Sequence, residues 1–261
     1  MFKRYLSLAA LAIAAFASST ASAQVTNFFE DFEGLDRNDP GALAGAGWNS
    51  AAAAFDFGGN FVFFGAGGAL NDLTNPRQSI ISDVPSGGAP PVGNQGLVVF
   101  SDYGSDIHFA GAARNTAFED LIISVFQERT ITAADIGNSV EFSWTADGNS
   151  APPTGDAIAE AFVLILDPNT GFSSSLDLTF DTAGTADGAL ATNSLSFDLN
   201  NPLLDGQILQ FGFRSVASDG EGSAVDYDNV ALTVTSAIPE PSSAIALALS
   251  GIVLLTRRRR S

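Results

Sequence analysis

The amino-acid sequence predicts an all-β protein, folded as a two-sheet antiparallel β-sandwich. Between the two ends of the chain, short segments rich in Phe, Val and Ile are separated by Gly, Asn, Asp and Pro, a pattern typical of strands joined by turns. The segment 139–148, SVEFSWTADG, alternates apolar with polar side chains and stops at Asp147-Gly148. It therefore predicts a strand with one face in the core.

The segment 159–180 predicts a β-hairpin within this sandwich. Its two apolar runs are joined by the sequence DPNTG at 167–171, in which the proline fixes φ and the glycine accepts a positive φ. Other strands are predicted, in chain order, within NFFEDFE, NFVFFG, GLVVF, LIISVF, SLSFDL, QILQFGFRS and AVDYDNVALTVT. About ten strands with turns between them favour two packed sheets.

Three segments between the predicted strands are expected to be irregular or briefly helical. The sequence TAADIG at 132–137 predicts one helical turn, capped by Thr132 and ended at Gly137. The Gly/Ala/Pro-rich segments 41–54 and 84–96 are predicted to be long loops, because strands flank each of them closely.

The first 23 residues predict a secretory signal peptide. Lys3 and Arg4 precede an apolar run from Leu6 to Phe16, and the small residues at 21–23, Ala-Ser-Ala, are typical of a cleavage site. The run is expected to be helical, with cleavage before Gln24. The protein is therefore predicted to be secreted.

Residues 24–236 are predicted to form one β-sandwich domain. The segment contains no repeat of fixed period and no internal linker, and some 215 residues can bury a full core without disulfides. Accordingly, the chain has no cysteine. Residues 24–238 carry five arginines and 28 Asp or Glu, a net charge of −23 (5 minus 28). Such a surface repels nucleic acid and anionic lipid, so cations are its natural small partners.

The last predicted strand contains candidate metal ligands. Val230, Leu232 and Val234 define a core-facing parity, and counting back by twos reaches Asp228 and Asp226. A carboxylate on a buried face needs a partner, and five arginines cannot serve 28 acids. Calcium, which prefers carboxylate and carbonyl oxygens, fits this composition. The alternative is that Asp228-Asn229 forms a turn or bulge beside an edge strand.

A family resemblance supports the calcium hypothesis. The segments FFEDFEG at 28–34 and VDYDNVALTV at 225–234 resemble the first and last strands of the carbohydrate-binding-module, MAM and LamG-like jelly rolls. In those families the acids of these two strands commonly hold a structural calcium ion. The resemblance implies a jelly roll with calcium ligands at Asp31 or Glu33 and at Asp228. Glu30 and Asp226 would be neighbours of that site.

Sugar binding by such sandwiches usually relies on exposed aromatic rings. Trp48 and Tyr103 lie in loop-like sequence and are the candidate contacts with a polysaccharide, whereas Trp144 follows the inward parity of its strand and is expected in the core. Catalysis has less support, because His108 is the only histidine and no serine lies in a nucleophile-elbow sequence. Acidic residues are abundant, so a glycoside hydrolase or lyase remains an alternative.

Residues 237–261 differ from the body of the chain. Pro239, Glu240 and Pro241 precede an apolar run at 244–255, which ends before Arg257, Arg258, Arg259 and Arg260. About 12 apolar residues cross a hydrocarbon core only marginally, and the arginines are expected to stay in the cytoplasm. A short hydrophobic helix is predicted here. An ordinary tail anchor is the alternative use of this segment, but it leaves the Pro-Glu-Pro triplet unexplained.

The order of these three elements closely resembles a PEP-CTERM sorting signal. The resemblance implies transient insertion in the inner membrane of a Gram-negative bacterium, followed by recognition and cutting by an exosortase. The products of this family reach the cell surface or the extracellular matrix and are often linked with exopolysaccharide and biofilm. We therefore expect a secreted, non-catalytic surface or matrix protein with a possible structural calcium. A dedicated carbohydrate-binding module is the second hypothesis.

Overall fold

A computed structural model describes residues 24–56, 58–71, 79–82, 93–101, 120–148, 158–183, 191–218 and 223–236. The predicted signal helix at 1–23, the sorting signal at 237–261 with its apolar helix, and Tyr103 lie outside the described residues, so these predictions stay predictions. Within the described ranges, no helix is long and apolar enough to cross a membrane.

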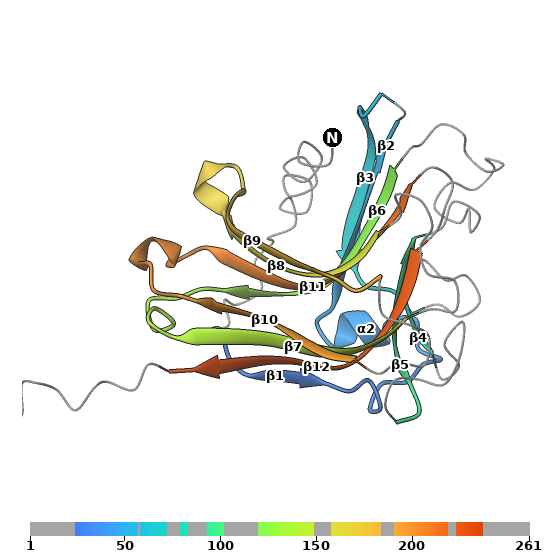
Figure 1. Cartoon of the computed structure of the whole chain (residues 1–261), viewed down its shortest axis with the longest axis horizontal. Coiled ribbons are helices and arrows are strands. Elements are labelled where there is room, and N and C mark those ends of the chain that lie inside the picture. Colours follow the sequence, from blue (N-terminus) through green and yellow to red (C-terminus); the bar gives the residue numbers. More distant parts are fainter. Residues whose placement is uncertain are drawn as a thin grey trace, which may run out of the picture.

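Two antiparallel β-sheets pack face to face, which confirms the predicted sandwich (Figure 1). Sheet A has the order β10-β7-β12-β5-β4, with β1 paired to β12. Its strands are β1 (Phe28–Glu30), β4 (Ser79–Ser82), β5 (Gly96–Ser101), β7 (Ser139–Gly148), β10 (Ala191–Asp198) and β12 (Ser223–Thr235). The first and last strands therefore lie side by side, as expected.

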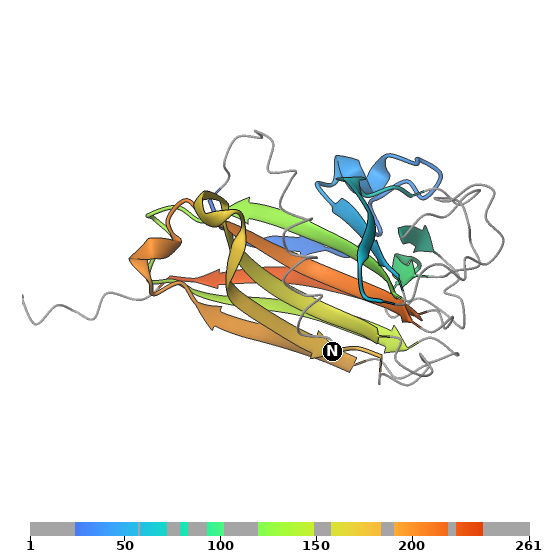
Figure 2. The same ribbon diagram turned by 90° about the horizontal axis from the view of Figure 1, so that it is seen from above.

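Sheet B has the order β3-β2-β6-β11-β8-β9. Its strands are β2 (Asn49–Phe55), β3 (Phe61–Gly68), β6 (Asp120–Thr130), β8 (Ile158–Asp167), β9 (Ser173–Asp181) and β11 (Ile208–Ser218). Of the short helices, η2 (Pro168–Thr170) connects β8 to β9 within this sheet, whereas α2 (Ala42–Gly45) and η3 (Pro202–Leu204) lie in connections between the two sheets. In Figure 1, β2 and β3 run at a steep angle to β8 and β9, and this change of strand direction shows the twist of the sheet. Figure 2 gives the view at right angles.

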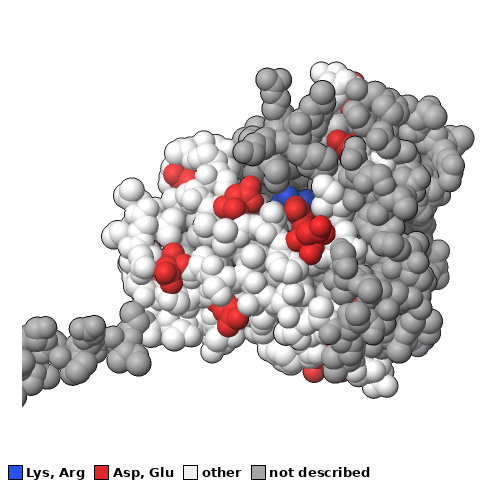
Figure 3. All heavy atoms as spheres, viewed as in Figure 1, with Lys and Arg blue, Asp and Glu red and all other residues white. Residues whose placement is uncertain are grey.

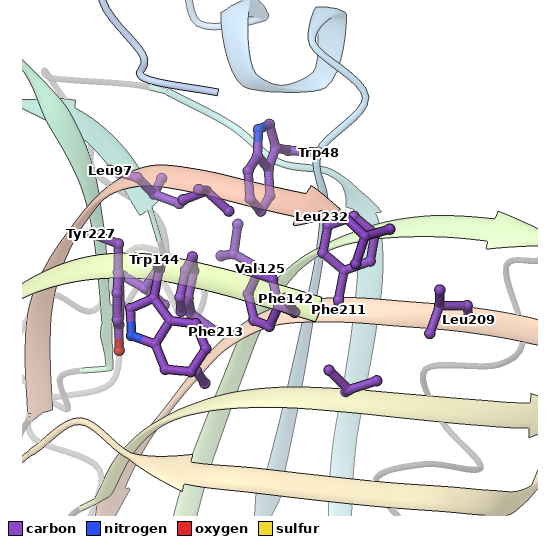
Figure 4. Packing of buried hydrophobic residues seen from close by; sticks show 14 of the residues in the cluster. Trp48, Leu97, Val125, Phe142, Trp144, Leu209, Phe211, Phe213, Tyr227 and Leu232 are labelled. Carbon is purple, nitrogen blue, oxygen red and sulfur yellow. The ribbon is translucent and has the colours of Figure 1, made fainter. Parts of the chain in front are cut away.

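The core lies between the two sheets and is rich in aromatic rings (Figure 4). Phe211 and Phe213 of β11 point inward and meet Phe142 and Trp144 of β7, with ring centroids 5.4 to 6.2 Å apart. Tyr227 of β12 stacks on Phe213 at 3.6 Å. The prediction that Trp144 is a core residue is confirmed, since its side chain is fully buried.

The predicted hairpin forms between β8 and β9. The carboxylate of Asp167 accepts a hydrogen bond from the main-chain N–H of Asn169 at 2.8 Å, and Gly171 ends the turn with φ of 72°. The sequence predicts this turn correctly, because the turn depends only on residues that are neighbours along the chain.

The prediction that segment 41–54 is a loop and the prediction of a helical turn at 132–137 are each wrong in part. The alanine-rich end of segment 41–54 forms β2, a strand paired with both β3 and β6. Alanine has a low intrinsic strand propensity, but Ala51 to Ala54 are buried at 0 to 4% exposure, so packing between two neighbours outweighs that preference. The segment 132–137 is a hydrogen-bonded turn instead of a helical one. There the hydroxyl of Thr132 donates to the carboxylate of Asp135 at 2.7 Å.

Candidate functional site

The predicted inward parity of Asp226 and Asp228 is wrong. The register between β12 and β7 shifts between Asp228 and Ala231, and Asn229 has φ of 48°, so a β-bulge interrupts the alternation. Before the bulge, Val225 and Tyr227 are the core residues. Asp226 and Asp228 therefore lie on the outer face of sheet A, where Asp226 is opposite Asp147 of β7. Both are nevertheless buried, at 2% and 1% exposure.

The acids near β1 bind main-chain amides. Glu30 accepts the N–H of Phe32 at 2.9 Å, and Asp31 accepts that of Glu33 at 3.2 Å. Burial raises the pKa of Glu30. Glu33 accepts the main-chain N–H groups of Asn94 and Gln95, which lower the pKa of its carboxyl group. These bonds tie the segment after β1 to the segment before β5.

The five predicted calcium ligands are not assembled into one centre. Among the described residues, no group of three or more His, Cys, Asp or Glu side chains is placed to hold a metal ion. Four of the five carboxylates accept main-chain N–H donors at one oxygen. The bulge also turns Asp226 and Asp228 to the outer face of their sheet. Calcium binding stays a prediction.

Trp48 is a core residue, so the prediction that it contacts a ligand is wrong. Its side chain is fully buried and its ring lies 5.9 to 6.5 Å from the rings of Phe28, Phe32 and Phe213. The reason is that Trp48 directly precedes β2, which enters the sandwich at this point (Figure 4).

The outer face of sheet B carries polar groups that the sequence analysis did not single out. Ser124 of β6, Arg214 of β11, Glu160 of β8 and Asp181 of β9 are successive cross-strand partners. We call these four residues the polar row. It runs from exposed Asp181 on the edge strand to buried Arg214 and Ser124 in the middle of the sheet.

An ion pair forms the middle of the polar row. Nη1 of Arg214 lies 2.7 Å from Oε1 of Glu160, with side-chain exposures of 5% and 17%. The guanidinium group also lies 4.8 Å from the ring centroid of Phe162, a cation–π distance. Burial raises the pKa of Glu160, and the charge of Arg214 opposes that shift. In Figure 3, acidic side chains form separate patches on a largely uncharged surface, and one small basic area lies among them.

Three buried polar atoms on this face have no hydrogen-bond partner among the described residues: Oγ of Ser124, Nε of Arg214 and Oε1 of Gln210. Gln210 lies two residues from Gly212 on the outward parity of β11, and its amide nitrogen donates to Glu128 at 2.9 Å. Buried polar groups are normally paired. The three atoms provide one donor, one acceptor and one hydroxyl that can act as either.

Gly212 shapes the same face between the polar row and Gln210. A Cβ atom at this position would overlap the carbonyl oxygen of Val125 and the Cα of Phe126. Without it, the rings of Phe126 and Phe162 approach across the strand to a centroid distance of 6.4 Å. The unpaired polar atoms therefore lie on the same face as the apolar rings of Phe126 and Phe162.

A signal for this face was present in the sequence. In QILQFGFRS, the residues Leu209, Phe211 and Phe213 alternate with Gln210, Gly212 and Arg214, which predicts a polar face opposite an aromatic one. The sequence does not reveal which strands flank β11, and so it gives no indication that Glu160 or Ser124 would join Arg214.

No family model matches the chain, and no curated protein matches it. Among solved structures, a xylan-binding domain, CBM22-1 of Paenibacillus barcinonensis Xyn10C, is 13% identical with a TM-score of 0.37, over 62% of this chain and 85% of that domain. A cyclase from Fischerella sp. TAU is 16% identical with a TM-score of 0.42, over 82% of this chain and all of the cyclase (100%).

The enzymatically active domain of bacteriophage CBA120 tailspike protein 4 is 8% identical with a TM-score of 0.44. The match covers 77% of this chain but only 21% of the tailspike chain, so this protein spans about a fifth of that structure. The similar structures thus include both binding modules and enzymes. At this level of similarity they carry no information on substrate or activity.

Proposed function

We propose that this chain is a secreted, non-catalytic protein of the cell surface or extracellular matrix, and that its outer sheet B face contacts polysaccharide. The observation that carries the proposal is the polar edge of this face, where Asp177, Thr179 and Asp181 of β9 are exposed and follow the outward parity of Glu160. A sugar hydroxyl is both donor and acceptor, so the hydroxyls of a polysaccharide can bond these carboxylates and the threonine hydroxyl. The exposed end of the polar row at Asp181 provides the approach from solvent.

The charge of the domain favours an uncharged polysaccharide. Residues 24–238 carry a net charge of −23, which repels polyanions at long range. The guanidinium of Arg214 is buried and paired with Glu160, so it offers no positive charge to a polyanion. A neutral glycan can approach the exposed side chains of β9 without the cost of bringing like charges together.

Among the described residues, the buried tryptophans and Tyr227 favour an adhesive role over that of a dedicated carbohydrate-binding module. Trp48, Trp144 and Tyr227 are fully buried or nearly so, and a sugar ring cannot stack on any of them. Many copies of a matrix protein can together hold a polysaccharide, even when each copy makes only weak contacts with it. The dedicated module remains the second candidate, and it predicts saturable binding by a single domain. A glycoside hydrolase or lyase is the third, and it requires two carboxyl groups about 5 to 10 Å apart in a cleft.

Delivery to the surface is proposed from the two ends of the sequence. The signal peptide is removed before Gln24, and an exosortase processes the segment that contains Pro239, Glu240 and Pro241 while Arg257 to Arg260 hold it in the inner membrane. Mass spectrometry of the mature protein from its host tests this step. An intact Arg260 in surface-exposed protein would contradict it.

Binding is tested with the fragment 24–236, which retains β1 to β12 and the core. Neutral and acidic polysaccharides are compared by affinity electrophoresis. We expect retardation by a neutral glycan, weakened several-fold by Thr179→Ala, which removes an exposed hydroxyl from the outward parity of β9. The matched control is Ser194→Ala, an exposed position on β10 of sheet A. No retardation by any matrix polysaccharide, or equal effects of both substitutions, would remove the glycan-binding role.

A further inference from the structure

Asp135, in the turn between β6 and β7, is a buried carboxylate whose two oxygens differ. Its side chain is fully buried. Oδ2 accepts hydrogen bonds from the main-chain N–H of Thr132 at 2.8 Å, from the Thr132 hydroxyl at 2.7 Å and from the main-chain N–H of Val25 at 3.4 Å. Oδ1 is buried and has no hydrogen-bond partner among the described residues. Among the described residues, all hydrogen-bond donors to Asp135 are neutral groups.

The contact with Val25 joins the beginning of the domain to a turn 110 residues later in the chain. Val25 is buried and belongs to the core, whereas Gln24 is exposed. Standard bond lengths keep consecutive main-chain nitrogens within about 3.7 Å of each other. The nitrogen of Gln24 therefore lies within about 7 Å of the Asp135 carboxylate.

We propose that Asp135 is the receptor for the α-ammonium group that signal-peptide cleavage creates at residue 24. The inference rests on the cleavage that is part of the proposed function. Hydrolysis of the Ala23–Gln24 bond consumes one water molecule and leaves a carboxylate on Ala23 and an amine on Gln24. The amine takes up a proton at neutral pH, because an α-amino group has a pKa of about 7.7 to 8.0.

The ammonium group provides the charged partner that Asp135 lacks in the precursor. In the precursor, the nitrogen of Gln24 is a neutral amide, and the buried carboxylate faces only neutral donors. A buried charge is costly unless it is paired. After cleavage, the ammonium group has three donors and can reach Oδ1 by a short rotation of residue 24. Processing would then fasten the start of the chain to the turn between β6 and β7, and the mature domain would be more stable than its precursor.

The sequence offers a clean way to remove this one charge. Lys3 is the only lysine of the chain, so residues 24–236 contain a single primary amine. The fragment is made with Gln24→Ala as its first residue, because an N-terminal glutamine cyclises slowly to a neutral lactam during purification and storage, which would mix charged and uncharged molecules in the sample. An acetylating reagent then neutralises the α-ammonium group and no other group.

Urea unfolding is measured for the fragment with and without acetylation, in the parent and in Asp135→Asn. We expect acetylation to raise the unfolding equilibrium constant of the parent about tenfold and to leave that of Asp135→Asn unchanged. Asp205→Asn, which changes an exposed acid, should respond as the parent does. An equal response with and without Asp135, or none in the parent, overturns the proposal.

A second measurement covers the case in which Asp135→Asn does not fold. The pH dependence of the acetylation rate gives the pKa of the α-amine in the folded parent and in urea. A higher pKa in the folded protein supports the ion pair, and equal values overturn it. The N-terminus of the protein from its host is identified separately by mass spectrometry. A first residue other than Gln24 would contradict the cleavage while the chemistry of the defined fragment still stands.

Discussion

Arg214 and Glu160 form a 2.7 Å ion pair on the outer face of sheet B, between two strands that are far apart in the sequence. The two partners differ in exposure, because Arg214 is nearly buried and Glu160 retains 17% of its side-chain surface. Glu160 can therefore release its charge by taking up a proton, whereas arginine stays charged at all ordinary pH values.

This asymmetry predicts that the two single substitutions differ in cost. Glu160→Gln leaves a charged guanidinium in a buried site and should cost about 3 kcal/mol of unfolding free energy. Arg214→Met should cost less, because the remaining carboxyl group can become protonated. Urea unfolding at neutral pH measures both. Asp205→Asn, which changes an exposed acid outside the strands of sheet B, is the control, and equal losses for the two partners would contradict the argument.

Gly212 should tolerate no side chain. A Cβ atom would overlap main-chain atoms of the neighbouring strand β6, so Gly212→Ala must push β6 and β11 apart. We expect a loss of about 2 kcal/mol or more in unfolding free energy. Gly67→Ala on β3 is the matched control, since no atom lies within 4 Å of a Cβ built there. A loss of the same size at Gly67 would show that the backbone freedom of glycine, and not the close approach, decides the result.

Calcium is predicted to stabilise the domain if the acids of β1 and β12 bind it. A ligand that binds only the folded state raises the melting midpoint. The midpoint of fragment 24–236 should rise by several degrees at millimolar calcium and fall again with chelator. Asp228→Asn should reduce this shift, with Asp205→Asn as the control. An unchanged midpoint would remove calcium from the description of this protein.

Glu33 predicts a specific loss of stability in acid. Its pKa is lowered by N–H donors of Asn94 and Gln95, so the folded state favours the ionised form. This contribution is complete above the unfolded carboxyl pKa of about 4.3 and is lost as the pH falls through the lower, folded value. Unfolding midpoints between about pH 5 and pH 2 should fall more steeply for the parent than for Glu33→Gln. Parallel curves would show that the carboxylate contributes nothing.

Much of the fold was predictable because it depends on short-range sequence. The alternation in 139–148 became β7, and the DPNTG turn became the β8–β9 hairpin. Period-two alternation and turn chemistry involve residues that are neighbours along the chain. The alanine strand β2 was missed, since its burial between β3 and β6 is a property of the sheet and not of the segment.

The candidate site was less predictable for the same reason. Counting along β12 places Asp226 and Asp228 in the core, but the bulge near Asn229 adds a residue and reverses the parity. The Gly- and Ala-rich sequence around Trp48 predicts a loop, whereas its ring packs on Phe28 and Phe213, which belong to other strands. Each error arose where a feature depends on which strand lies beside another.

The sequence by itself determined the all-β class, the strand and turn pattern of β7 to β9, the burial of Trp144 and the acidity of the body. The tertiary structure decided that Ser124, Arg214 and Glu160 share one row, and that Asp135 meets Val25 across 110 residues. The physical reason is that side-chain alternation is local, whereas strand order, register and bulges are set by packing between segments that the sequence does not place next to each other.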